Sequence, residues 1–193
     1  MIMKNPLIAE LESHIASLRQ TVSECGGIIG EIAECIVACF QQGNKLLLCG
    51  NGGSAADAQH IAAEFVNRFR FDRPALPVIA LTTDSSILTC ISNDSSFDCV
   101  FSRQVEALAQ ESDILVAIST SGGSANVLNA LDIARAKKAK VIGFTGEKGR
   151  APFGTRCDLC LVVPSADIAR IQEAHEFVWH IICGMVEERL FGK

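Results

Sequence analysis

The chain has 193 residues, of which 49% are hydrophobic and 20% are charged, and its formal net charge is −5. These proportions are ordinary for a compact globular enzyme and exclude a disordered chain, which could not bury enough apolar surface to fold. The acidic balance also argues against a nucleic-acid partner, because such a partner would require a cluster of basic residues. We therefore expect one domain over residues 1–193 that does not bind nucleic acid.

No secretory signal or membrane-spanning helix is predicted. Pro6, Glu10 and Glu12 interrupt any apolar segment near the amino terminus, and no apolar run approaches the ~20 residues that span a bilayer. The nine cysteines are scattered along the chain and odd in number, which is typical of reduced thiols. Cys157 and Cys160 form the closest pair, but no second pair or neighbouring histidine completes a zinc motif, so we interpret them as structural. These features predict a cytoplasmic protein without membrane contact.

The first forty residues are predicted to be helical. Apolar residues recur at alternating spacings of three and four over Ile8–Cys25, which places them in one stripe along a helix. The pair Gly26–Gly27 is expected to break this helix, and a second helix is expected to end at Gly43. A heptad-like stripe can pack on its own domain or on a partner helix. We therefore interpret residues 1–43 as an N-terminal helical segment that is involved in oligomerisation.

Beyond residue 44, short apolar runs alternate with amphipathic helical patterns. The apolar runs are typical of buried parallel strands, and the alternation predicts an α/β fold with helices on both faces of the sheet. The predicted strands are Lys45–Cys49, Val78–Leu81, Ile114–Ile118, Val141–Phe144 and Leu159–Val163. The predicted helices are Ser54–Phe69, Ser86–Ile91, Val100–Ala109, Ala125–Ala136 and Ala169–Leu190.

Two loops rich in glycine and serine follow predicted strands, at the sheet edge where α/β proteins collect ligands. Residues 50–54 read GNGGS, and residues 119–124 read STSGGS. Glycine allows close backbone approach, and free N–H groups at a helix start favour an anion. Neither loop has the lysine of a Walker A motif or the spacing of a dinucleotide fingerprint. We interpret them as a cradle for a sugar phosphate, although each alone could be an ordinary turn and Ser124 a simple N-cap.

A polar constellation is predicted on the helix after the first loop. His60, Glu64 and Arg68 are each four residues apart, so they share the face opposite the apolar stripe. An imidazole and a carboxylate side by side are suited to joint metal ligation. On spacing alone, however, a solvated polar face with an i,i+4 pair is the more common explanation.

The last predicted helix carries Gln172, His175 and His180. His175 lies close to the apolar stripe and is interpreted as a packing histidine, whereas His180 points away from the stripe. On a straight helix, Gln172 and His180 would be about 12 Å apart along the axis. For both to bind one metal ion, the helix start must be irregular, the side chains must reach far, or the ligands must come from different subunits.

The segment Leu48–His60, LCGNGGSAADAQH, resembles the first phosphosugar-binding motif of the sugar isomerase (SIS) superfamily, and more narrowly that of the phosphoheptose isomerase family. The resemblance covers essentially the whole chain. Two positions depart from residues found in relatives: Ala169 stands where some have an acidic residue, and Gly123 where a polar residue is frequent. The resemblance continues through Arg73–Pro74, Ile91–Asp94, Ser119–Gly122 and Ala169–His175.

The resemblance implies the SIS fold, a three-layer αβα sandwich with a five-stranded parallel sheet and N-terminal helices. It implies a homotetramer with active sites at subunit interfaces and one zinc ion per subunit. It also implies conversion of sedoheptulose 7-phosphate to D-glycero-D-manno-heptose 7-phosphate, the first step of activated-heptose biosynthesis for lipopolysaccharide or capsule. By match to the family, the zinc ligands are His60, Glu64, Gln172 and His180. The implied substrate-binding residues are Asn51, Gly52, Gly53, Ser54, Glu64, Asn93, Asp94, Ser119, Thr120, Ser121, Ser124 and Gln172.

The implied reaction moves a proton between C1 and C2 through an enediolate, so the developing oxyanion must be stabilised. A zinc ion would polarise the substrate oxygens. We assign Glu64 as the base for the carbon proton and His180 as the group that handles the oxygen proton. Because one residue cannot easily be a tight ligand and a free base together, Glu64 is expected to exchange these roles as substrate binds.

Two other functions remain open on the sequence. A non-catalytic SIS protein that binds a partner, such as a replication initiator, would keep the phosphate loops. Relatives of that kind lack the residues that match Glu64 and His180, and this chain has both. An isomerase of another sugar phosphate is the second alternative, because the loops recognise phosphate and do not count the carbons of the sugar.

Overall fold

The computed structural model of the chain describes residues 5–192. Its centre is a parallel sheet of five strands in the order β2-β1-β3-β4-β5. The strands are β1 Leu46–Gly50, β2 Val78–Ala80, β3 Ile114–Ile118, β4 Lys140–Gly146 and β5 Leu159–Val163. The α-helices are α1 Pro6–Gln41, α2 Gly53–Val66, α3 Ser85–Asp94, α4 Ser102–Leu108, α5 Ala125–Ala136 and α6 Ile168–Phe191. Short 3₁₀ helices are η1 Phe97–Cys99, η2 Glu147–Gly149 and η3 Gly154–Arg156.

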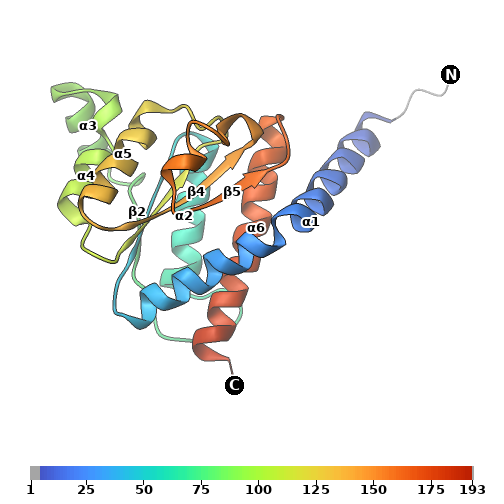
Figure 1. Ribbon diagram of the computed structural model, residues 1–193, viewed down its shortest axis with the longest axis horizontal. Helices are drawn as coiled ribbons and strands as arrows, with labels where there is room; N and C mark the ends of the chain where they lie inside the picture. The colour runs from blue at the N-terminus through green and yellow to red at the C-terminus, as the bar shows by residue number, and fades with distance from the viewer. Residues whose placement is uncertain (1–4, 193) are drawn as a thin grey trace.

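Helices cover both faces of the sheet, so the molecule has three layers (Figure 1). On one face, α1, α2 and α6 pack against strand residues such as Leu48 and Val116. On the other face, α4 and α5 pack against intervening residues such as Leu47 and Leu115. Every residue of β1 and β3 is buried, which is why both strands appear in the sequence as continuous apolar runs. The predicted αβα sandwich with five parallel strands is confirmed.

Helix α1 is continuous, and the predicted break at Gly26–Gly27 is wrong. The helix begins after Asn5, whose side chain accepts a hydrogen bond from the backbone N–H of Leu7 at 3.0 Å. A glycine weakens a helix by about 1 kcal/mol. Ile29 and Ile32, just beyond the two glycines, are buried in the core, and burying such a side chain contributes about 1.5–3 kcal/mol. Tertiary burial therefore outweighs the local cost of the glycines.

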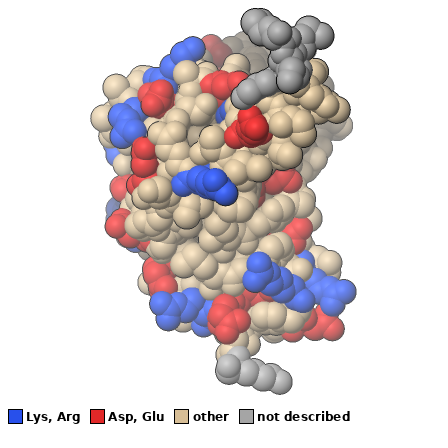
Figure 2. Space-filling model, turned by 90° about the vertical axis from the view of Figure 1, so that its right-hand side faces the viewer, with Lys and Arg blue, Asp and Glu red and all other residues tan. Residues whose placement is uncertain are grey.

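The apolar stripe of α1 is buried mainly in the second half of the helix. From Cys25 onward the stripe belongs to the core that α1 shares with α2 and α6. Figure 1 shows the first half extending beyond the rest of the domain, and Figure 2 shows broad uncharged areas between interspersed acidic and basic groups. The involvement of residues 1–43 in oligomerisation stays a prediction. The exposed large apolar residues of α1 are Leu7, Ile8, Leu11, Ile15 and Val22.

All nine cysteines are free thiols. A Cβ at Gly143 would lie 2.5 Å from Sγ of Cys157 and 3.2 Å from Sγ of Cys160, so the two sulfur atoms fill the space over this glycine. Both cysteines pack against the core on the α5 face of the sheet. This packing agrees with a structural role for the pair. Among the described helices, none combines the length and apolar character of a membrane span.

His175 is fully buried, as predicted for a packing histidine. Its ring stands edge-on to that of Phe144, with centroids 5.6 Å apart. Its Nε2 lies 3.3 Å from the carbonyl oxygen of Thr145, and its Nδ1 has no hydrogen-bond partner within residues 5–192. Burial lowers the pKa of His175 to about 4, and the Thr145 hydrogen bond offsets only part of that shift. The ring is therefore neutral at physiological pH.

We predict that His175 makes the free energy of unfolding fall on acidification. Its folded pKa of about 4 lies below its ordinary value of 6.5, so the unfolded chain binds the proton preferentially between these values. Stability is lost as the pH falls through about 6.5, and the loss reaches about 2 kcal/mol near pH 5. Urea unfolding of wild type and His175→Gln at several pH values measures this effect. The stability advantage of the wild type should shrink on acidification, and a constant difference would contradict the prediction.

Candidate functional site

The two glycine- and serine-rich loops lie side by side at the carboxyl edge of the sheet. Gly50, at the end of β1, is in register with Ile118, at the end of β3. Because β2 pairs with the other side of β1, the chain order reverses here, and ligands of open α/β sheets bind at such a point. The side-chain amides of Asn51 and Asn126 exchange two hydrogen bonds of 2.9 Å. These bonds therefore link the first loop, residues 50–54, to α5, the helix that follows the second loop.

Both loops lead into helices whose first N–H groups have no side-chain cap within the described structure. Gly52, which precedes α2, has no side chain, and Ser124 makes no capping hydrogen bond to α5. The Oγ of Ser124 lies instead 3.4 Å from the Oγ of Ser119. Ser124 is thus not the simple N-cap that the sequence left open. Uncapped N–H groups at two helix starts favour an anion between them.

Gly122 determines the shape of the second loop. Its φ of +67° is in the left-handed region that favours glycine, and a Cβ here would lie 2.5 Å from Cα of Gly149. The N–H of Gly122 donates to Oγ of Ser119 at 3.1 Å. Thr120 is half-buried and Ser121 is exposed. The loop therefore presents hydroxyl-bearing residues at an accessible edge of the sheet.

His60, Glu64 and His180 come together where α2 lies beside α6. Nε2 of His60 is 2.9 Å from Nε2 of His180 and 3.8 Å from Oε1 of Glu64. One ligand atom from each residue lies within 4.8 Å of the others. The i,i+4 spacing brings the first two together, and the packing of the helices adds the second histidine. Two imidazole nitrogens and one carboxylate oxygen at these distances fit a divalent metal ion that accepts nitrogen ligands.

Two acidic residues near this cluster were not identified from the sequence. Oε1 of Glu176 lies 3.9 Å from Nε2 of His60. Asp57 lies one turn before His60, and its buried Oδ2 has no hydrogen-bond partner within the described residues. Burial first, and the charge of Glu176 second, raise the pKa of Asp57 to about 6. The spacings Asp57–His60 and Glu176–His180 could have indicated both residues, since each is a single helical turn.

Gln172, in the first turns of α6, lies against Gly53 at the start of α2. A Cβ at Gly53 would be 2.5 Å from Nε2 of Gln172, so the end of the glutamine side chain packs against this glycine. Helix α6 runs without interruption from Ile168, so the irregular start that the sequence left open is not observed. His180 is about 12 Å further along the helix axis. A role for Gln172 as a metal ligand stays a prediction.

Asn93 and Asp94 end helix α3, and both are exposed. Nδ2 of Asn93 donates to Oδ1 of Asp94 at 2.8 Å. Figure 1 shows α3 and α6 well apart, on different sides of the domain. Within one chain, these two predicted substrate-binding residues are therefore separated from Gln172 and His180.

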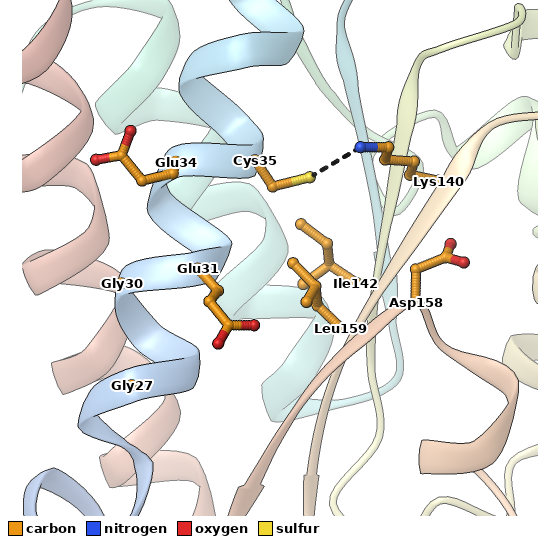
Figure 3. A pocket seen from close by; sticks show the side chains of 9 residues that line it. All are labelled: Gly27, Gly30, Glu31, Glu34, Cys35, Lys140, Ile142, Asp158 and Leu159. Atoms are coloured by element: carbon orange, nitrogen blue, oxygen red, sulfur yellow. Dashed lines mark hydrogen bonds between the residues drawn. The ribbon is translucent and has the colours of Figure 1, made fainter.

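A groove of about 660 Å³ lies elsewhere in the molecule, between α1 and the sheet (Figure 3). Gly27 and Gly30 of α1 leave room for it, and Nζ of Lys140 lies 3.9 Å from Sγ of Cys35 at its margin. Lys140 begins β4 and Leu159 begins β5, so the groove is at the amino ends of the strands. Ligands of α/β sheets bind at the opposite, carboxyl edge. The groove is therefore separate from the two loops and the histidine cluster.

Comparisons with known proteins identify the family and the fold. The family model of the SIS domain matches residues 11–146. The phosphoheptose isomerase of Burkholderia pseudomallei strain K96243 is 55% identical over 165 residues, which are 86% of this chain and 83% of that protein. The phosphoheptose isomerase of Roseiflexus sp. strain RS-1 is 54% identical over 185 residues, which are 96% of this chain and 93% of that protein. A solved phosphoheptose isomerase structure from Francisella tularensis has a TM-score of 0.91 at 38% identity and covers 97% of this chain and 100% of that one.

We predict that Asn126→Ala weakens the binding of inorganic phosphate at the two loops. The substitution removes both amide hydrogen bonds that hold the half-buried Asn51, and two such bonds together contribute about 1–3 kcal/mol. Titration calorimetry should therefore give a Kd for phosphate that is about 5- to 100-fold higher. Asn129→Ala is the matched control, because Asn129 lies on the same helix, is exposed and donates to the carbonyl of Asp98. Wild-type affinity in the Asn126 variant would refute the role of this amide pair.

Proposed function

The chain belongs to the phosphoheptose isomerase family of SIS-domain proteins and is an aldose–ketose isomerase of sedoheptulose 7-phosphate; we propose that it forms D-glycero-D-manno-heptose 7-phosphate between the two loops and the cluster of His60, Glu64 and His180. The observation that carries the proposal is the convergence of these three side chains from two helices, with the histidine nitrogens 2.9 Å apart. The cluster supplies groups that can transfer protons beside a site for a cation.

The phosphate of the substrate is assigned to the two loops. A phosphate monoester carries nearly two negative charges and several acceptor oxygens, which N–H and O–H donors can satisfy without a lysine. The uncapped helix starts of α2 and α5 and the amide link between Asn51 and Asn126 support this assignment. The phosphate-binding residues that we propose are Asn51, Gly52, Gly53, Ser54, Ser119, Thr120, Ser121 and Ser124.

We assign zinc as the cofactor, with one ion per subunit. His60, Glu64 and His180 would hold it, and Gln172 would be the fourth ligand. Magnesium and calcium prefer oxygen ligands, whereas two imidazoles with a carboxylate suit zinc. When bound, the ion would polarise the carbonyl and hydroxyl oxygens of the substrate. Glu176, 3.9 Å from His60, adds negative charge that would favour a cation.

Glu64 and His180 are the proposed proton-transfer groups. Glu64 removes the proton from C1 of the ketose and returns it to C2, so that an enediolate forms and collapses to the aldose. His180 moves the hydroxyl proton from O1 to O2, which keeps the two oxygens from being charged at the same time. The Glu64 side chain is 21% exposed, so it can reach a bound substrate. Its exchange between ligand and base remains part of this proposal.

Assembly of the full site is proposed to require more than one subunit. Asn93 and Asp94 lie on α3, apart from α6, so the proposed substrate residues do not all converge within one chain. The exposed apolar residues in the first half of α1 offer a surface for association. We propose a homotetramer with active sites at subunit interfaces, working in the cytoplasm at the first step of activated-heptose biosynthesis for lipopolysaccharide or capsule.

A non-catalytic regulator that binds a replication initiator is not favoured. Such relatives lack the residues that match Glu64 and His180, whereas here both are present and lie in one cluster. The relatives compared above are named phosphoheptose isomerases, and their matches to this chain cover most of their length. The same matches favour sedoheptulose 7-phosphate over another sugar phosphate as substrate.

We predict that turnover of sedoheptulose 7-phosphate depends on a divalent metal ion. Prior chelation should abolish formation of heptose 7-phosphate, because charge stabilisation of the enediolate would be lost. Zinc should restore activity more effectively than magnesium, since the ligand set contains two imidazoles. A coupled assay of the product on chelated and reconstituted protein measures this. Full activity after complete metal removal, verified by elemental analysis, would exclude the metal-assisted mechanism.

We predict that Glu64→Gln and His180→Gln each lower kcat by about 10²- to 10⁴-fold, because each removes a proton-transfer group while keeping its approximate size. Steady-state kinetics with sedoheptulose 7-phosphate measures the loss. Glu106→Gln is the control, because Glu106 is an exposed residue of α4 that pairs with Arg103. Near-normal turnover in either active-site variant would remove that residue from the mechanism.

A further inference from the structure

Arg73, whose side chain is buried and has no part in the proposed chemistry, donates hydrogen bonds to the carboxyl end of α2. Nη2 of Arg73 donates to the carbonyl oxygen of Glu64 at 2.7 Å, and Nη1 donates to that of Phe65 at 2.8 Å. These carbonyls belong to the last turn of the helix, where backbone acceptors lack intrahelical partners. A cation here also complements the negative end of the helix dipole. The guanidinium thus fixes the backbone of the residue that is proposed as the base.

The same guanidinium forms an ion pair with α6. Nε of Arg73 lies 2.9 Å from Oε1 of Glu187, and the two side chains are only 1% and 2% exposed. The Glu187 carboxylate also accepts hydrogen bonds from the backbone N–H groups of Phe69, at 3.1 Å, and Arg70, at 2.8 Å. Burial alone would raise the pKa of Glu187, but these bonds and Arg73 lower it below its ordinary value. The pair therefore stays charged and links α2, the segment 67–73 and α6.

The segment held by Glu187 contacts the proposed active site directly. The Phe69 ring stacks on the imidazole of His180, with centroids 5.5 Å apart and planes 10° apart. Nε2 of that imidazole lies 2.9 Å from Nε2 of His60. An aromatic ring against one face of an imidazole restricts its rotation, because turning would collide with the ring. The ion pair therefore constrains the positions of both Glu64 on α2 and His180 on α6.

We propose that Arg73 and Glu187 are positioning residues for the isomerisation: their ion pair sets the separation of Glu64 and His180 and, through Phe69, the orientation of the His180 ring. This inference rests on the proposed function. Neither residue supplies an atom to the metal-binding cluster. Lysine cannot replace Arg73, because one ammonium group cannot reproduce the planar fork that serves three backbone carbonyls and a carboxylate. The phosphate loops lie outside this link, so substrate binding should change less than the chemical step.

Arg73→Lys is the first test. It should lower kcat by about 10- to 100-fold with KM within about threefold, because a displacement of about 1 Å can cost that much in rate. Zinc affinity, measured by competition with a chromogenic chelator, should weaken by about 10- to 100-fold. Leu131→Ala is the stability control, since Leu131 is fully buried in the core on the other face of the sheet. Below its own Tm, the control should keep wild-type kcat and zinc affinity.

The outcomes separate positioning from simple stabilisation. If Arg73→Lys melts at a lower temperature but keeps wild-type kcat and zinc affinity, the proposal is overturned. If Arg73→Lys does not fold, Phe69→Leu replaces it, with a lower kcat and a shifted pH–rate profile as the expected result. Wild-type values of both in Phe69→Leu would then overturn the proposal. Zinc affinity needs no substrate, so an inactive wild type would refute the proposed function while the affinity of Arg73→Lys still tests the positioning role.

Discussion

The packing of α2 against α6 is the contact on which the rest of the structure depends. Both helices lie on the same face of the sheet, and their apolar sides belong to one core. Close packing of such a core determines how the polar residues at its margin meet. The two histidines approach to 2.9 Å because they flank this packed seam. The core residues involved are Ala58, Ile61 and Phe65 of α2 and Ala174, Val178 and Ile182 of α6.

Two carboxyl groups near this contact show how the environment moves a pKa in opposite directions. Asp57 has a buried oxygen without a hydrogen-bond partner in the described chain, and burial raises its pKa to about 6. Glu187 is more deeply buried, yet two backbone N–H groups and Arg73 keep its pKa low. An unsatisfied carboxyl one helical turn from His60 is typical of a functional site, whereas a fully hydrogen-bonded one strengthens the scaffold. The contact between α2 and α6 therefore contains both the proposed proton-transfer groups and the Arg73–Glu187 ion pair.

The sheet topology supplies the other half of the site. Pairing of β1 with β3 places the two loops at one edge, and the amide pair of Asn51 and Asn126 links them. Gly122 is required because its φ is positive and the loop folds onto the backbone of Gly149, whereas Gly53 packs against the end of the Gln172 side chain. The proposed phosphate site and the proposed proton-transfer groups therefore rest on different contacts.

The sequence by itself determined the five strands, most of the helices and the local parts of the site. The boundaries predicted for Ile114–Ile118, Ala125–Ala136 and Leu159–Val163 coincide with the observed elements, because buried strands and amphipathic helices leave a local pattern of burial. The pairing of His60 with Glu64 could be predicted from the sequence for the same reason, since four residues make about one helical turn.

Only the tertiary structure decided what local patterns cannot encode. The glycines of α1 indicated a break, but burial on both sides of them keeps the helix whole. His60 meets His180 across 120 residues of sequence, and Arg73 meets Glu187 across 114. Periodicity reveals which face of a helix is buried, but not which partner it packs against. The relative positions of distant elements are fixed only when the whole core packs, and this packing brings the residues of the site together.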